Sequence, residues 1–219
     1  MRRLIPTAAR ILIALAVAGV VALPTTPSAM AATPSFDCGK VGGQIEKLIC
    51  HDDTLAALDR ETARLYRLAR GTPGLTARQS NELTATRRGW IKGRNVCWKA
   101  DDRETCVRDR TLARVYELRR DYPAARSRDR DGVSLGPWSF SCTGLAETLR
   151  VTFANVDPSL AYLAWGDHVL VMTLGLSGSG ARYVAYTPNG ESVFWNKGRN
   201  ASFRMPDGKE TDCTEAPDR

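Results

Sequence analysis

The spacing of apolar residues changes once along this chain, and that change limits the folds it can adopt. Before about residue 120, apolar residues recur in steps of three and four, which is typical of amphipathic helices. After Trp138 they alternate with polar residues, which is typical of strands that bury one face. The sequence therefore predicts an α+β protein in two domains, a small disulfide-bonded α-helical domain followed by a small antiparallel β-barrel.

Three helices are expected in the first half. The first carries an apolar stripe over residues 55–69, and residues 52–54 just before it supply capping side chains. The second begins at residues 76–79 (TARQ), which fit a capping box, and runs towards Cys97. The third starts near Asp102 and is stopped by Pro123 because proline cannot continue a helix.

Short alternating segments separated by turn residues fill the second half, at residues 149–153, 168–176, 182–186, 193–195 and 201–205. Asn189-Gly190 lies between two of them and predicts a hairpin, since both central positions of its tight turn need positive φ. Pro206-Asp207-Gly208 marks another turn. Many short strands with turn signals indicate a small antiparallel barrel or sandwich.

The first 31 residues have the order of a secretory signal peptide. Arg2 and Arg3 precede an apolar run of 13 residues (11–23), and small residues flank a cleavage point before Ala32. A membrane-spanning helix needs ~20 residues, so an uncleaved anchor is the weaker alternative. Because the first cysteine is Cys38, the cleavage point offers no lipidation site. We expect an exported protein, periplasmic or secreted, that is not a lipoprotein and has no stable membrane anchor.

A polar stretch separates the two predicted domains. Residues 124–136 contain almost no apolar side chains and are rich in charge, glycine and serine, as linkers are. We therefore place the helical domain at 32–122, the linker at 123–136 and the barrel at 137–219.

Cysteine usage fits export. All six cysteines follow the predicted signal peptide, and an even number in an oxidising compartment indicates disulfides. Cys142 and Cys213 bracket the β-rich half, where a bridge would tie the first strand to the last and constrain the unfolded chain by roughly 4 kcal/mol. The other four, in the helical half, leave three connectivities open: Cys38, Cys50, Cys97 and Cys106.

Charge is divided unevenly between the halves. Residues 32–138 hold 21 Lys/Arg against 15 Asp/Glu, a balance of +6, whereas residues 139–219 hold 7 against 9, a balance of −2. The basic surface therefore belongs to the helical half, and the β-rich half can approach a basic partner.

The residues that catalysis needs do not gather in any familiar pattern. The two histidines, His51 and His168, fall in different predicted domains, and no G-x-S-x-G elbow occurs. Histidine-type metal sites need more ligands than this, and the cysteines are better explained as disulfides. Carboxylate pairs for glycoside hydrolysis stay an open alternative, although no pair stands out. We expect no catalytic residues, no metal and no cofactor.

Two segments in the β-rich half carry the clearest functional signal, residues 176–183 (LSGSGARY) and 194–201 (FWNKGRNA). From spacing alone, these segments would form turns, with Tyr183 and Trp195 in the core and Lys197 in solvent. Together and in this order, they resemble the two signature loops of the MliC/PliC family, bacterial inhibitors of C-type lysozyme. The resemblance covers residues 137–213, and the flanking cysteines are similar to that family's single bridge.

The resemblance implies a partner and the residues that bind it. C-type lysozyme is the expected protein partner, Ser179 and Lys197 fall on the family's inhibitory serine and lysine, and Tyr183 falls on the tyrosine that supports the first loop. Gly180 and Arg182 belong to the same lysozyme-binding motif. Residues 184–193, between the two motifs, are a few residues longer than the family pattern. This longer hairpin tip either lies at the far end without effect or alters which lysozyme fits.

The helical half is similar to the LprI-like N-terminal domain. The residues that carry this resemblance are 35–38 (SFDC), 46–50 (EKLIC), Asp59, and a Trp90…Arg94…Cys97 series. Arg87 stands where glutamine is more usual in that family. These residues also have a structural interpretation, with cysteines in bridges, Trp90 in the core, and Asp59 and Arg94 as an ion pair.

A second hypothesis for the function is an alternative to lysozyme inhibition. The chain would then be a non-catalytic cell-envelope module whose basic helical half binds an anionic polymer or surface. High salt would weaken such exposed contacts more than a lysine buried in a cleft. We expect no nucleic-acid partner, and the sequence leaves the oligomeric state open.

Overall fold

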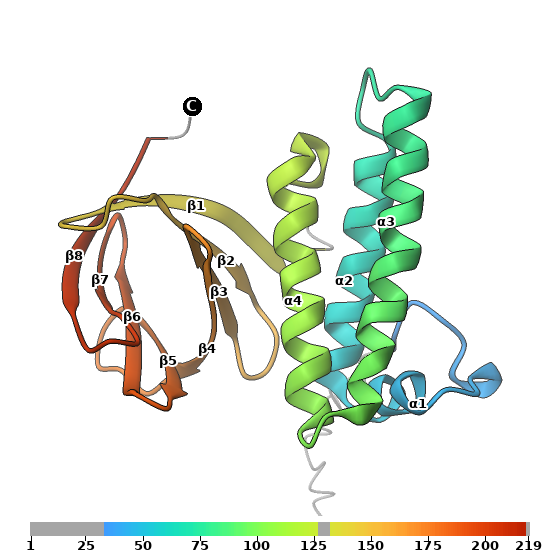
Figure 1. Ribbon diagram of the computed structural model, residues 1–219, viewed down its shortest axis with the longest axis horizontal. Coiled ribbons are helices and arrows are strands. Elements are labelled where there is room, and N and C mark those ends of the chain that lie inside the picture. Colours follow the sequence, from blue (N-terminus) through green and yellow to red (C-terminus); the bar gives the residue numbers. More distant parts are fainter. Residues whose placement is uncertain (1–32, 127–131, 218–219) are drawn as a thin grey trace, which may run out of the picture. The chain divides into compact units, whose positions relative to one another are not determined.

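The structure of the chain is a computed structural model that describes residues 33–126 and 132–217 (Figure 1). The predicted signal peptide, and residues 127–131 of the predicted linker, lie outside the described residues. The rest of that linker contains the short helix η3, Pro123–Arg126, and the first residues of strand β1.

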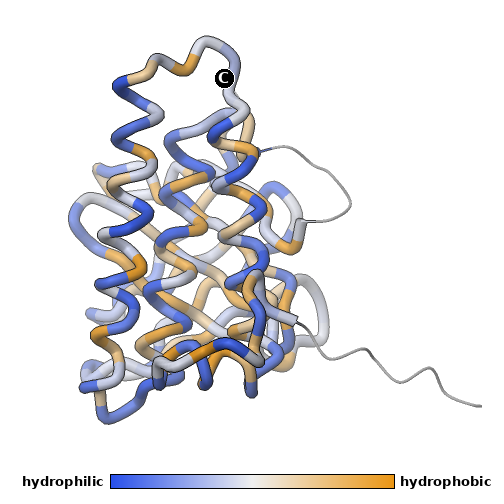
Figure 2. Tube along the Cα trace, turned by 90° about the vertical axis from the view of Figure 1, so that its right-hand side faces the viewer, coloured by the Kyte–Doolittle hydropathy of each residue, from blue (hydrophilic) through white to orange (hydrophobic). Residues whose placement is uncertain are grey.

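Within residues 33–126, the structure contains four α-helices and three short 3₁₀ helices, with hydrophilic and hydrophobic positions mixed along each long helix (Figure 2). Their bounds are η1 Cys38–Lys40, α1 Gln44–His51, α2 Asp53–Arg70, α3 Ala77–Asn95, η2 Val96–Lys99, α4 Arg103–Asp121 and η3 Pro123–Arg126. The three long helices confirm the three that were predicted. The two-turn helix α1 was missed because it is too short to show a clear period.

Local capping explains where the long helices begin. Asp52 accepts a hydrogen bond from Leu55 N at 2.8 Å, and Asp102 accepts one from Thr105 N at 2.9 Å. Thr76 and Gln79 form the full capping box, each accepting from the backbone N–H of the other. A capping side chain satisfies an N–H that has no partner within the helix, so these starts could be predicted from a few neighbouring residues.

Eight antiparallel strands form a closed barrel in which each strand pairs with its neighbours in sequence and β1 pairs with β8 (Figure 1). The strands are β1 Ser134–Cys142, β2 Leu149–Ala154, β3 Leu160–Trp165, β4 His168–Gly175, β5 Ala181–Thr187, β6 Gly190–Lys197, β7 Asn200–Arg204 and β8 Glu210–Glu215. Their inward side chains, led by Phe140, Phe194 and Phe203, fill the barrel. The predicted fold class is confirmed.

The hairpin between β5 and β6 turns one residue earlier than predicted. Thr187 pairs with Gly190, so Pro188 and Asn189 occupy the turn, and only Gly190 has positive φ, at 119°. The hairpin itself is confirmed, but the predicted position of its turn was wrong, because the ring of a proline such as Pro188 holds φ near −65°. A turn that needs positive φ at both central positions cannot contain it.

Strand β3 is buried on both faces and was not predicted. Ala161, Leu163 and Trp165 face the barrel core, whereas Leu160, Tyr162 and Ala164 belong to the core formed with the helices. The ring centroids of Tyr162 and Tyr116 of α4 lie 5.0 Å apart. A strand covered on both sides has no polar face and therefore no alternation to detect.

A buried carboxylate links α2 to the start of β1. Glu61 is 2% exposed, accepts hydrogen bonds from Arg64 Nε at 2.7 Å and Nη2 at 2.8 Å, and also accepts from the backbone N–H and hydroxyl of Ser134. Burial alone would raise the pKa of Glu61, but hydrogen bonds from Arg64 and Ser134 outweigh it and hold the pKa below its ordinary value. Nearby, Arg119 Nε donates to Gly136 O at 2.7 Å.

Three disulfides are present, and they settle the connectivity that the sequence left open. Cys38 is bonded to Cys50, Cys97 to Cys106, and Cys142 to Cys213. The predicted bridge between the first and last strands of the barrel is confirmed, since Cys142 and Cys213 are directly paired residues of β1 and β8.

Residues 31–219 form one compact unit, and the boundaries of the two domains stay a prediction. Among the described residues, no helix combines the length and apolar character needed to cross a bilayer.

Removing the Glu61 carboxylate should destabilise the fold strongly. Glu61→Ala removes the carboxylate that pairs with the buried Arg64, and breaking a buried ion pair in this way typically costs about 3–5 kcal/mol. Because folding lowers the pKa of Glu61, its contribution to stability is present above its ordinary value of 4.5 and is lost as pH falls through the lower folded value. Denaturant unfolding at several pH values measures both effects. Glu61→Gln should flatten the dependence below pH 4.5, and an unchanged acid slope would contradict the role of Glu61.

Candidate functional site

Two connections at one end of the barrel bring the predicted motif residues together. Residues 176–180 join β4 to β5 and are called the first loop. Residues 197–199, which are the last residue of β6 and its connection to β7, are called the second loop. Alternate connections of consecutive antiparallel strands lie at the same end, so these two are neighbours. Pairing of Ala181 with Asn196 places the first loop beside the end of β6.

Gly180 is where the first loop and β6 meet. It has φ of +66°, and a Cβ added there would lie 2.4 Å from Asn196 O and 3.0 Å from Lys197 Cγ. Only glycine can combine this conformation with so close an approach. The loop backbone therefore lies directly against the stem of Lys197.

The backbone of Ser179 is held by two donors while its side chain stays exposed. Its carbonyl oxygen accepts a hydrogen bond from Trp195 Nε1 at 2.8 Å and another from Ser177 Oγ at 2.6 Å. The first loop is thus anchored from within and from β6, and it presents the Ser179 hydroxyl to solvent.

Lys197 is exposed and lies against the same tryptophan. Its Nζ is 3.5 Å from the centroid of the Trp195 ring, a cation–π contact worth about 0.5–1 kcal/mol at an exposed position. Trp195 therefore contacts both loops, through its N–H on one side and its ring face on the other.

Tyr183 and Arg182 lie behind the two loops. Tyr183 is 5% exposed, packs against Phe153 in the barrel, and its hydroxyl is 3.3 Å from Ser159 Oγ. Burial raises the pKa of Tyr183, against the opposing effect of that hydrogen bond. Arg182 is paired with Glu191 of β6 at 3.1 Å. Both side chains are engaged with the barrel itself.

Two residues at this end were missed by sequence reasoning. Trp195 was assigned only as a core residue, although its indole group holds both loops. Leu176 is 98% exposed at the first residue of the first loop, which is unusual for a large apolar side chain. The exposure of Leu176 could have been predicted from the sequence, because the Gly/Ser-rich turn that follows it has no apolar side chain to cover it.

The helical half contains the predicted ion pair. Arg94 Nη1 lies 2.9 Å from Asp59 Oδ1, and both side chains are buried. Trp90, expected in the core, is only partly buried, and its Nε1 donates to Arg110 O at 3.1 Å. His51 ends α1 and His168 begins β4. Within residues 33–126 and 132–217, no group of three or more potential metal ligands gathers.

Comparison with known proteins agrees with this geometry. Residues 140–212 match the family described as membrane-bound lysozyme-inhibitor of c-type lysozyme. The barrel and its two loops are therefore of a lysozyme-inhibitor class.

A longer stretch is similar to Lipoprotein LprI of Mycobacterium bovis (strain ATCC BAA-935 / AF2122/97) and of Mycobacterium tuberculosis strains CDC 1551 / Oshkosh and ATCC 25618 / H37Rv. Each is 32% identical over 162 residues, which cover 73% of this chain and 76% of the relative. The chain belongs to the LprI family. The family match over residues 140–212 supports lysozyme inhibition as its general function.

Substituting Gly180 should disturb the meeting of the two loops. In Gly180→Ala, the new methyl group collides with Asn196 O, and the left-handed conformation alone costs about 1–2 kcal/mol. We expect lower stability and a shifted NMR resonance of the Trp195 indole N–H. Gly178→Ala is the control, because nothing lies within 4 Å of an added Cβ there. Equal effects of the two substitutions would contradict the close contact at Gly180.

Proposed function

We propose that this chain is an exported inhibitor of C-type lysozyme that inserts Ser179 and Lys197 into the two-carboxylate cleft of the enzyme. The supporting observation is the contact of the two loops at Gly180, which sets both side chains at one end of the barrel. A single insertion can then use both. Had the two side chains stood at opposite ends, this mechanism would have been impossible.

The chemistry of the cleft explains why a lysine is suited to it. Lysozyme works with two carboxylates, one a general acid and one anionic. The ammonium group of Lys197 is a point charge with three donors on a long stem, so it can bind both carboxylates and exclude the sugar. Ser179 can donate one hydrogen bond and accept others, which suits it to the acid residue.

Trp195 prepares the two loops for insertion. It fixes the carbonyl oxygen of Ser179 and rests under Lys197 Nζ, so neither loop has to be ordered at the moment of binding. Lys197 must leave the ring to reach the carboxylates. That contact is weak compared with a desolvated charge pair, so the exchange favours the complex.

The remaining motif residues are assigned to shaping the binding end. Gly180 allows close approach of the loop backbone, Tyr183 supports the loop from inside the barrel, and the Arg182–Glu191 pair braces β5 against β6. Exposed Leu176 would add apolar contact beside the cleft. Because residues 139–219 carry a balance of −2, the barrel is the part best able to lead the approach to a basic enzyme.

Loss of the Lys197 ammonium should weaken inhibition severely. Truncating one partner of a buried charge pair costs about 2–5 kcal/mol, so Lys197→Ala should raise the inhibition constant roughly 30- to several thousand-fold in a cell-wall lysis assay. Lys209→Ala is the matched control, since Lys209 is also exposed but lies in the turn between β7 and β8 at the other end. An unchanged inhibition constant for folded Lys197→Ala would reject the mechanism.

We also propose that the mature chain carries no lipid, unlike relatives that are named lipoproteins. Cys38 is the first cysteine of the chain, and its sulfur is bonded to Cys50. A periplasmic or secreted inhibitor of this kind would protect the cell wall of its producer from host lysozyme.

The mass of the exported protein tests this proposal. Intact mass spectrometry without reductant should give the chain from Ala32 onwards with three disulfides and no acyl groups. A mass increased by lipid, or a chain still carrying the N-terminal apolar run, would contradict it.

A further inference from the structure

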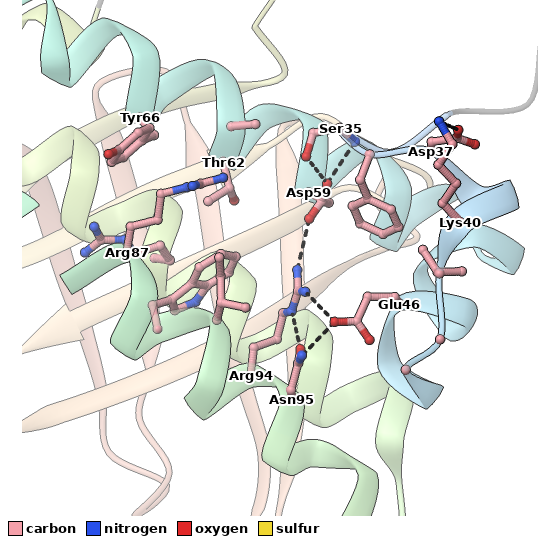
Figure 3. A pocket seen from close by; sticks show the side chains of 18 of the residues that line it. Ser35, Asp37, Lys40, Glu46, Asp59, Thr62, Tyr66, Arg87, Arg94 and Asn95 are labelled. Atoms are coloured by element: carbon pink, nitrogen blue, oxygen red, sulfur yellow. Dashed lines mark hydrogen bonds and ion pairs between the residues drawn. The ribbon is translucent and has the colours of Figure 1, made fainter. Parts of the chain in front are cut away.

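A pocket in the helical half is not used by the proposed inhibitory loops. It has a volume of about 730 Å³ and lies among residues 35–46, α2, α3 and α4 (Figure 3). That volume falls within the usual range for small-molecule sites. Its lining combines the rings of Phe36, Tyr66 and Trp90 with arginine side chains from two helices, and none of its residues belongs to the barrel.

The carboxylates in this pocket are already occupied. Asp59 accepts hydrogen bonds from Ser35 N at 2.9 Å, from Ser35 Oγ at 2.6 Å and from Arg94 Nη1 at 2.9 Å (Figure 3). Glu46 accepts from Asn95 Nδ2 at 2.7 Å and lies 4.0 Å from Arg94 Nη2. The third lining carboxylate, Asp37, accepts from Gly39 N at 2.9 Å and lies 3.2 Å from Lys40 Nζ, so each carboxylate of the pocket already has a donor.

Donor groups, in contrast, are left over. The guanidinium carbon of Arg87 lies 4.9 Å from the centroid of the Tyr66 ring, and in the described part of the chain Arg87 pairs with no carboxylate. Arg114 is buried and paired with Glu117, and its second contact, to Thr86 Oγ1, is long at 3.4 Å. Since a guanidinium offers five donors and no acceptor, the pocket is prepared for an anion.

The aromatic walls restrict what else the ligand can be. Tyr66 carries Arg87 on its ring, and the guanidinium of Arg94 lies 5.1 Å from the centroid of Trp90, so cationic and apolar surfaces alternate across the pocket. A small inorganic anion would leave the rings without contacts. A cyclic ligand that carries a carboxylate would contact both kinds of surface, with its ring against the aromatic side chains and its carboxylate bound by Arg87.

We propose that this pocket binds a carboxylate-bearing sugar of the bacterial cell-wall glycan. An exported protein of a lysozyme-inhibitor class works where this glycan is the abundant polymer, and the lactyl carboxylate of its acidic sugar projects from a pyranose ring. The proposal rests on the proposed export of the chain, but not on insertion of the barrel loops into lysozyme, because the two sites share no residue.

A matched pair of disaccharides tests the carboxylate. N-acetylglucosaminyl-N-acetylmuramic acid and diacetylchitobiose have similar pyranose rings, but only the first carries a lactyl carboxylate. Calorimetric titration of the full mature chain should give binding of the acidic disaccharide at least about tenfold tighter than that of diacetylchitobiose. Equal affinities, or no binding of either sugar, would overturn the proposal.

Two arginine variants locate the site. Arg87→Gln keeps a side chain of similar length without the charge and should remove the preference for the acidic disaccharide. Arg88→Gln is the control, since Arg88 is the next residue, is also exposed and does not line the pocket. Unfolding curves establish that both variants are folded, and an equal loss in the two would overturn the assignment to this pocket.

The peptide stem of the cell wall supplies the competing source of carboxylates. The isolated stem tetrapeptide should bind more weakly than the acidic disaccharide, because it has no pyranose ring to lie against Tyr66 and Trp90. Tighter binding of the tetrapeptide would overturn the assignment of a sugar.

Discussion

Closure of the barrel is the constraint on which the proposed site depends. Strand β1 pairs with β2 on one side and with β8 on the other, and Cys142–Cys213 joins directly paired residues at that seam. Closure removes the free edges and fixes every strand between two neighbours. Because consecutive strands are antiparallel, the connection before β5 and the connection after β6 share one end. The contact of Gly180 with the stem of Lys197 follows from this topology.

The helical half stabilises the barrel through direct contacts. Leu160, Tyr162 and Ala164 of β3 bury one face against helical side chains, and Glu61 of α2 satisfies the start of β1. A buried ion pair offsets the cost of its desolvation only where its geometry is good and further hydrogen bonds match the remaining donors and acceptors. Arg64 and Ser134 supply those matches, which explains why a carboxylate can be buried there at all.

Features set by a few neighbouring residues could be predicted from the sequence. The capping box at Thr76 and the single-face strands were of this kind. The Cys142–Cys213 bridge joins residues 71 apart in the sequence, and it could be predicted because the two cysteines bracket the β-rich half. Two other features depend on how distant elements pack, and these could not be predicted. Strand β3 shows no alternation because helices cover its outer face, and the helical disulfides were ambiguous until the fold brought Cys97 near Cys106.

The candidate site divides in the same way. The motifs predicted that Ser179 and Lys197 act together, but not that Trp195 connects them, because that contact depends on the register of β5 with β6. The same register pairs Arg182 with Glu191, which a motif alone could not indicate. Pro188 moves the hairpin turn by one residue. This proline was visible in the sequence, but the prediction gave more weight to the Asn189-Gly190 turn signal.

The outward face of β3 has a consequence for how such proteins are built. A barrel of this type that occurs without helices would expose positions 160, 162 and 164 to water. Leucine, tyrosine and alanine there would form an exposed hydrophobic patch that is prone to aggregation. Fusion to the helices permits apolar residues there and, once they are present, makes the two halves difficult to separate. Recombination that exchanged only the barrel between family members would therefore have to exchange the facing side of α4 with it.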